Sequence, residues 1–97
     1  MKQHQILIGL TAALNDERLN AWHLTIFFAL VELFKQSKRD GPFSISRKKV
    51  MELSRIKAAP TYHKYISELQ HLGYIRYHPS YHPKKGSSIR IMFKTQA

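Results

Sequence analysis

A helical repeat of apolar residues begins at Leu19 and is the clearest pattern in the chain. Apolar side chains recur at steps of three and four residues from there to Phe34, which is the spacing of one face of a helix. Asn20 is a suitable N-cap, and the turn residues of 38–42 (KRDGP) end the helix. Further apolar residues widen the surface beyond one stripe, so we expect this helix to form the centre of the core. Its surplus apolar surface over 21–36 leaves room for a homodimer contact.

A second, shorter helix is predicted over residues 47–54. Ser46 ends a brief strand in 42–46 (PFSIS) and can cap this helix, while Val50 and Leu53 face the core. The first turn carries three cations, which are Arg47, Lys48 and Lys49. Cations are unfavourable at the positive end of a helix dipole unless an anion such as phosphate binds there.

A third helix is predicted over about 59–72, with Pro60 in its first turn and Gly73 at its C-terminal cap. At 100° per residue one side of it is apolar and the other polar. The apolar side holds Tyr62, Tyr65, Ile66, Leu69 and Leu72. The opposite side holds His63, Lys64, Ser67 and His71, with Glu68 at its margin. The pattern therefore predicts an amphipathic helix with a polar and basic outer face.

Beyond the third helix the apolar period changes from 3.6 to two, which indicates strands. Ile75 and Tyr77 alternate with Arg76 and His78, and the same alternation runs through SIRIMF at 88–93. These two half-buried strands flank the nine residues PSYHPKKGS. Such a connection is longer than the ~2–5 residues of an ordinary hairpin loop, and long loops of this kind are often functional.

Together the elements predict a mainly helical α+β fold, with a three-helix core and a C-terminal two-stranded β-hairpin. A chain of 97 residues, 43% of them hydrophobic, suits one domain over 1–97. Residues 19–93 are its expected core, and the pattern of 1–17 fits either a helix or a strand. The longest apolar run, 21–34, is shorter than the ~20 residues of a membrane span. No signal-peptide pattern or cysteine is found, so we expect a cytoplasmic protein without disulfides.

Positive charge is concentrated in the second half of the chain. The net charge is +10, of which residues 1–46 carry +1 and residues 47–97 carry +9. A half with so many like charges repels itself unless a polyanion offsets the repulsion, so nucleic acid is the expected partner. The alternative is that the lysines only keep the protein soluble.

The order of helix, short strand, two further helices and basic hairpin resembles the winged helix-turn-helix domains of bacterial transcription regulators. The stretch TYHKYISELQHLGYIRY carries this likeness, with a threonine opening the reading helix and a glycine-aromatic-isoleucine exit into the wing. SISRKKVMELSRIKAAPTYHKYISEL is similar to the helix-turn-helix of GntR-type regulators, although Ala59 and Pro60 replace polar residues there. The resemblance implies sequence-specific binding of double-stranded DNA by a small regulator or an accessory factor of a mobile element. We expect no effector-binding domain in this chain.

The resemblance assigns roles to fifteen residues of this sequence. Base edges would be contacted by Thr61, His63, Lys64 and Ser67. Phosphates near the reading helix would be contacted by Arg47, Lys48, Lys49, Arg55 and Lys57. The wing would add Arg76, Tyr81, His82, Lys84 and Lys85, with Arg90 on the neighbouring strand.

Other classes of function have less support in the sequence. His78 and His82 stand four apart, but each precedes a proline, which disfavours helical geometry and with it a helical metal site. The six acids are scattered without a paired-carboxylate spacing, so we expect neither an enzyme nor a cofactor. Two alternatives stay open. One is an interaction module that docks its basic face on an acidic protein, and the other is a binder of single-stranded nucleic acid.

Overall fold

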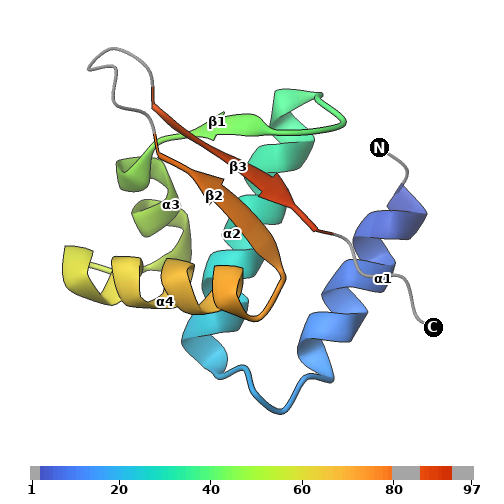
Figure 1. The fold of residues 1–97 in the computed structure, drawn as a ribbon, viewed down its shortest axis with the longest axis horizontal. Coiled ribbons are helices and arrows are strands. Elements are labelled where there is room, and N and C mark those ends of the chain that lie inside the picture. The colour runs from blue at the N-terminus through green and yellow to red at the C-terminus, as the bar shows by residue number, and fades with distance from the viewer. Residues whose placement is uncertain (1–2, 80–85, 93–97) are drawn as a thin grey trace.

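The computed structural model describes residues 3–79 and 86–92, which form four helices and three strands (Figure 1). The elements follow in the order α1 Gln3–Leu14, α2 Ala21–Ser37, β1 Phe43–Ile45, α3 Arg47–Ser54, α4 Ala59–His71, β2 Ile75–His78 and β3 Ser87–Ile91. The fold is therefore α+β and mainly helical, as predicted. The sequence of residues 1–17 fitted either a helix or a strand, and the structure shows the helix α1 there.

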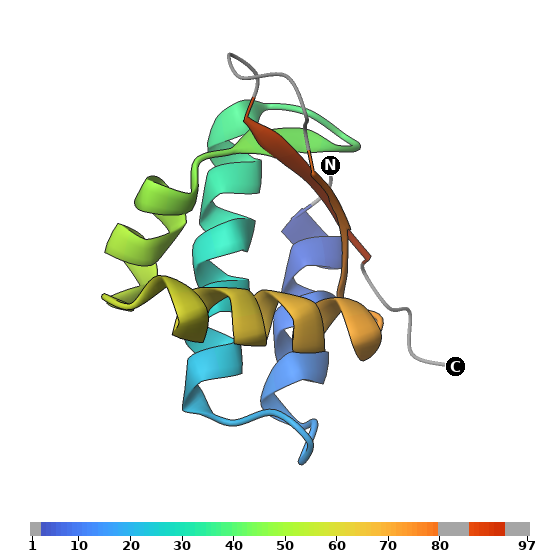
Figure 2. The same cartoon turned by 60° about the vertical axis from the view of Figure 1, so that its left-hand side comes forward.

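The α2 helix is the centre of the core, and its ends are where the sequence placed them. Asn20 Oδ1 accepts hydrogen bonds from the backbone N–H groups of Trp22 (2.8 Å) and His23 (3.3 Å). Ile26, Phe27 and Leu30 are fully buried along the helix, whereas Trp22, near its N-terminus, is 45% exposed. In both views the sheet lies on one side of α2, and α4 runs across α2 (Figures 1 and 2).

The α3 helix begins as predicted but buries a different residue. Its N-cap, Ser46, accepts a hydrogen bond from the backbone N–H of Lys49 at 3.3 Å, and Val50 is fully buried. Leu53, expected to face the core, is 38% exposed. Ser54 is fully buried instead. Its hydroxyl donates to the carbonyl of Val50 at 2.7 Å, so the buried polar group is satisfied within the helix.

The turn between α4 and β2 fixes the direction in which the hairpin leaves the helices. Gly73 has φ 87°, a left-handed conformation that glycine adopts at little cost. Its N–H donates to the carbonyl of Gln70 at 3.0 Å, and the N–H of Tyr74 donates to that of Leu69 at 2.9 Å. This pair of bonds is a Schellman motif, which closes the last turn of α4 and turns the chain into β2.

The sheet has three antiparallel strands in the order β1-β3-β2, not the two of the expected hairpin. The segment 42–46 was predicted as a strand, but its partner was not, because it pairs with β3 through a register that places Phe43 opposite Ile89. Ile89 also lies opposite Tyr77 of β2. The middle strand therefore ties the hairpin to the segment that precedes α3.

The loop between α1 and α2 is attached to the start of β2 by a charged hydrogen-bond network. Asp16 Oδ2 accepts from the hydroxyl of buried Tyr74 at 2.6 Å and from the Arg18 guanidinium at 2.7 Å. The Arg18 hydrogen bond, followed by that of Tyr74, holds the pKa of the Asp16 carboxyl well below its usual range. Burial raises the pKa of Tyr74 to about 12, so its phenol remains a donor at neutral pH.

We expect this network to make the protein less stable in acid. A carboxyl with a lowered pKa in the folded state stabilises that state at neutral pH, and this contribution is lost as the pH falls below ~4. Asp16→Asn should therefore lower the free energy of unfolding at pH 7 and flatten its dependence on pH below 4. Urea unfolding followed by circular dichroism at several pH values measures both. Equal acid sensitivity of wild type and variant would contradict the assignment.

Within the described ranges, no helix is long and apolar enough to cross a membrane.

Candidate nucleic-acid interface

The first turns of α3 and α4 meet the end of β2 and the start of β3 around a hollow of about 310 Å³. Figure 1 shows α3, the start of α4, the end of β2 and the start of β3 on the same side of the molecule. The residues that line this hollow are Ile45, Arg47, Tyr62, His63, Tyr77 and Ser87. Two of them, Arg47 and His63, are exposed residues that the sequence assigned to the site.

The outer face of α4 is as polar as the 100° spacing predicted. His63, Lys64 and Ser67 are exposed, while Tyr65 is buried beneath them. Thr61 is only half-buried rather than outward-facing, because it stands one helical turn before Tyr65 and shares its flank. Lys64 Nζ lies 5.2 Å from the centroid of the Tyr65 ring, a cation-π distance that restrains this side chain against the helix.

A buried histidine holds α4 in place. His23 Nδ1 accepts from the backbone N–H of Asn20 at 2.9 Å, which leaves the proton of the neutral ring on Nε2. That nitrogen lies 2.7 Å from Glu68 Oε1 and donates to it. The ring also meets Tyr65 edge to face at 4.7 Å between centroids. His23 is thus a positioning residue that fixes the rotation of α4 about its own axis.

This role of His23 was not predicted from the sequence. Glu68 was expected at the margin of the outer face of α4, and no function was assigned to His23. The available signal was local, since a histidine three residues after an N-cap can complete a capping box by accepting from the N-cap backbone. The contact between α2 and α4 spans 45 residues and is visible only in the fold.

Cations gather in a second groove of about 620 Å³ along α3 and the turn that follows it. Its lining residues are Arg47, Lys48, Met51, Glu52, Arg55, Ile56 and Lys57. Four of the five predicted phosphate-binding residues therefore lie together, and Arg47 belongs to both grooves. Lys49 is exposed but lines neither of them.

Arg76 does not join these groups. On β2 the alternate residues Ile75 and Tyr77 face the helices, so Arg76 lies on the opposite, exposed face of the sheet. There it stands directly across from Arg90 of β3. The register places the two predicted wing cations together, on a face apart from the hollow at α4.

Tyr62 is a residue of the hollow that the sequence assigned only to the apolar side of α4. Its side chain is almost fully buried in the wall, and burial raises the pKa of Tyr62 to about 12. On the other side of the hollow, the hydroxyls of Tyr77 and Ser87 lie 2.9 Å apart. The hollow therefore offers neutral hydroxyl groups beside the charge of Arg47.

Four predicted wing residues, Tyr81, His82, Lys84 and Lys85, lie outside the described residues. Among the residues that are described, His, Asp and Glu form no group of three or more that could hold a metal ion.

Comparisons with known proteins leave this geometry to be interpreted by itself. No family model matches the chain, and no match was found among curated proteins or solved structures.

Proposed function

We propose that this protein binds double-stranded DNA as a winged helix-turn-helix domain. The α3 and α4 helices form the helix-turn-helix, and β2 and β3 form the strands of the wing. The observation that carries the proposal is the outer face of α4, where exposed His63, Lys64 and Ser67 lie next to the cations of α3. Such a protein acts as a small transcription regulator or as an accessory factor of a mobile element.

The dimensions of α4 fit the major groove of B-form DNA. A helix of 13 residues is ~20 Å long, and with side chains it is ~10–12 Å across, against a groove width of ~12 Å. The Ala59 end of α4 stands beside the basic α3 groove. Inserting this end first brings base-reading side chains and phosphate-binding cations to the duplex together.

The residues divide into two classes by what they would contact. Lys64 donates to guanine O6 or N7, and His63 and Ser67 contact neighbouring base edges. The cations that surround the α3 groove bind phosphates, which fixes position without reading sequence. Thr61, being half-buried, makes a smaller contribution than its neighbours.

Selection of binding sites from a pool of random duplexes tests the proposal. We expect the wild-type chain to enrich a defined site, and Lys64→Ala to enrich a site that is degenerate at one or two positions, at a cost of ~1–3 kcal/mol for the original site. Gln70→Ala is not a suitable control, because the Gln70 side chain accepts from the backbone N–H of Tyr77 at 2.6 Å. His71→Ala, at the far end of the same exposed face, is expected to retain the wild-type site. No enrichment of any sequence would overturn the proposal.

Arg55 allows binding to be separated from stability. It caps α3 in a left-handed conformation, with φ 64°, and Lys38 caps α2 in the same way, with φ 58°. Arg55→Gly relieves this backbone strain but loses an attraction to the helix dipole, so we expect stability to change by less than about 1 kcal/mol. DNA affinity should fall roughly five- to tenfold at 0.1 M salt, because one phosphate contact is lost.

Lys38→Gly is the matched control, since it removes a cation from an equivalent left-handed cap that lies outside the α3 groove. Fluorescence anisotropy with a labelled duplex gives the affinities, and thermal unfolding gives the stabilities. If both variants weaken binding equally, Arg55 has no specific contact with DNA.

A further inference from the structure

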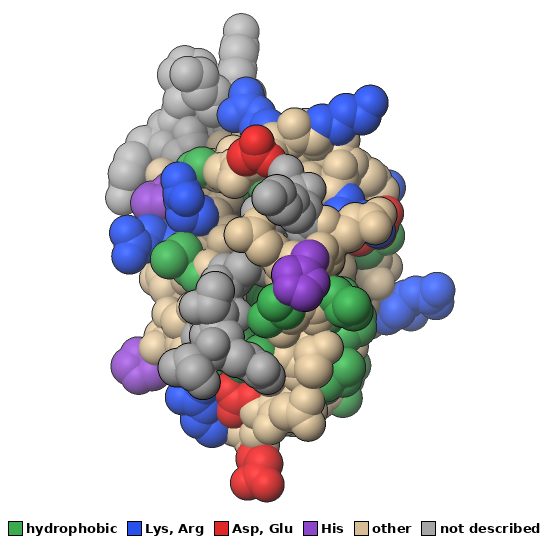
Figure 3. All heavy atoms as spheres, turned by 90° about the vertical axis from the view of Figure 1, so that its right-hand side faces the viewer, with side chains coloured by type: hydrophobic (Ala, Val, Ile, Leu, Met, Phe, Trp, Pro, Cys, Tyr) green, Lys and Arg blue, Asp and Glu red, His purple; other side chains and the backbone are tan. Residues whose placement is uncertain are grey.

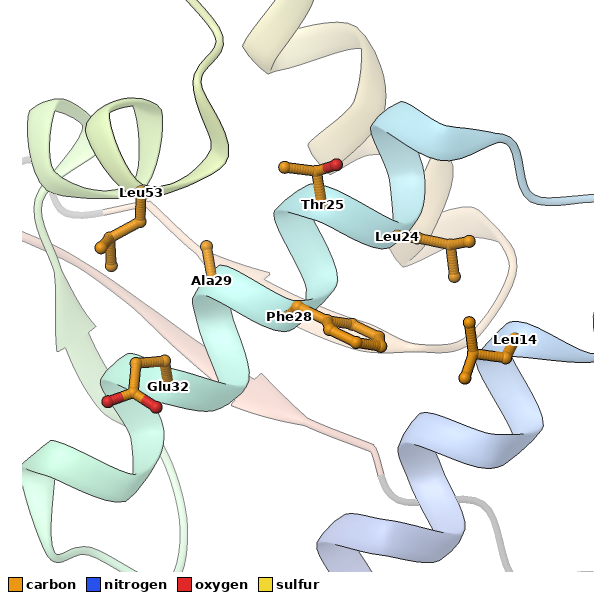
Figure 4. A pocket seen from close by; sticks show the side chains of 7 residues that line it. All are labelled: Leu14, Leu24, Thr25, Phe28, Ala29, Glu32 and Leu53. Atoms are coloured by element: carbon orange, nitrogen blue, oxygen red, sulfur yellow. The ribbon is translucent and has the colours of Figure 1, made fainter.

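An apolar groove of about 430 Å³ runs along the face of α2 that is turned away from the sheet (Figure 4). Thr25, Phe28 and Ala29 of α2 form its floor, with Leu14 of α1 on one side and Leu53 of α3 on the other. None of these residues belongs to the hollow at α4 or to the basic groove of α3.

The groove leaves large apolar side chains exposed to water, which is unfavourable for a single copy of the chain. Leu14 is 61% exposed, Phe28 40% and Leu53 38%, and Leu7 of α1 is 63% exposed two turns before Leu14. Figure 3, which views the side that carries α1, shows a group of hydrophobic side chains on that side. Burying one such side chain completely contributes ~1.5–3 kcal/mol, so covering several together is strongly favourable.

The distribution of charge on the chain limits which kind of partner can bind in this groove. Among the described residues that line it, Glu32 alone is charged; it lies 3.6 Å from Lys35 and accepts from Gln36 at 3.0 Å. Residues 19–34 contain no Lys or Arg, whereas residues 47–97 carry +9. An acidic partner would be drawn to the basic groove of α3, and a basic partner would be repelled by a chain of +10.

We infer that a second copy of this chain occupies the groove and forms a two-fold symmetric dimer. Two chains of +10 can approach closely only through faces without excess positive charge, and the α1 and α2 face is such a surface on each of them. Thr25 and Ala29 are small and one helical turn apart, so they let a second α2 lie close, and Phe28 of each copy then enters the groove of the other.

The dimer leaves the outer face of α4 free on both copies, because the groove is lined by residues of α1, α2 and α3 and shares none with the hollow at α4. The association does not depend on nucleic acid. It is therefore measured without DNA, and its failure would leave the proposed function untouched.

Sedimentation equilibrium of the full chain at 1–100 μM tests the inference, with concentrations chosen to span about 10⁻⁶–10⁻⁴ M dissociation constants. We expect the wild type to approach twice the monomer mass of 11.4 kDa. Phe28→Glu should weaken the dimer at least about tenfold. Leu53→Asp, on a different helix, should have the same effect, and circular dichroism shows that each variant remains folded. Higher salt should strengthen the dimer, because it screens the repulsion between the two chains.

Trp22→Gln is the matched control. Trp22 is on the same helix as Phe28 and is 45% exposed, but it does not line the groove. This variant should dimerise like the wild type. A monomeric wild type at 100 μM, a folded Phe28→Glu that still dimerises, or dissociation by Trp22→Gln as strong as by Phe28→Glu would each overturn the inference.

Discussion

Raising the salt concentration from about 50 to about 200 mM should weaken binding of this protein to duplex DNA by roughly 250- to 1000-fold. Each phosphate neutralised by a Lys or Arg releases condensed counterions, so the logarithm of affinity falls with the logarithm of salt at a slope of ~0.9 per contact. With ~4–6 contacts the expected slope is about −4 to −5. Anisotropy titrations of a labelled duplex at four or five salt concentrations give the slope directly.

Removing the three cations of the first α3 turn shows whether they supply part of that slope. If each of Arg47, Lys48 and Lys49 binds a phosphate, replacing all three by Gln should reduce the slope by ~2.7. Lys49 lines neither the hollow at α4 nor the α3 groove. A reduction of the slope by only ~1.8 would therefore assign the phosphate contacts to Arg47 and Lys48.

A second set of three cations provides the control for charge alone. Lys35, Lys38 and Arg39 line a separate pocket at the C-terminal end of α2, away from the α3 groove. Replacing these three by Gln lowers the net charge equally but should leave the slope unchanged. A flat salt response of the wild type would contradict DNA binding itself, and equal losses in the two triple variants would contradict the placement of the interface.

The helices of the core were predictable because their signals are local. Asn20, Ser46 and Gly73 act through hydrogen bonds and backbone angles within a few residues. Asn20 and Ser46 begin helices and Gly73 follows the end of one, each where the sequence placed it. The exposure of His63, Lys64 and Ser67 follows from helical geometry alone. These features need no knowledge of the rest of the chain.

The remaining features depend on contacts between distant segments. The pairing of β1 with β3 joins residues over 40 positions apart, and the alternation that predicted β1 does not name its partner. The helical α1 was undecided because apolar residues in QILIGLTAAL suit either period. The burial of Ser54 in place of Leu53 follows from how two-turn α3 packs on α2, which periodicity over eight residues cannot resolve.

The candidate site shows the same division between local and distant signals. The cations were identified one by one from charge, but their arrangement was not. The register of β2 and β3 puts Arg76 across from Arg90 on the outer sheet face, while α3 and its turn bring Arg47 and Arg55 into one groove. The sequence had already assigned these two groups to different parts of the site. The fold adds that Arg76 is paired with Arg90 across the two strands and that Lys49 lies outside the α3 groove.

Replacing Ile89 by alanine should lower the free energy of unfolding by ~2–5 kcal/mol, which is a large share of the ~5–15 kcal/mol typical of a domain. Ile89 is fully buried on the middle strand, opposite Phe43 of β1 and Tyr77 of β2. With a strand on either side and the helices beneath, the surroundings cannot collapse into the cavity that the substitution leaves. In a two-stranded hairpin, one flank of Ile89 would lack a neighbour and the loss would be smaller.

Urea unfolding followed by far-ultraviolet circular dichroism measures this loss, and Arg90→Ala is the neighbouring control. Arg90 points out of the other face of the same strand and is exposed, so its replacement should change stability by no more than about 0.5 kcal/mol. A loss below about 1 kcal/mol for Ile89→Ala would contradict a central, packed β3. At temperatures where Ile89→Ala is still folded, its salt slope should equal that of the wild type, because the substitution removes core packing and no cation.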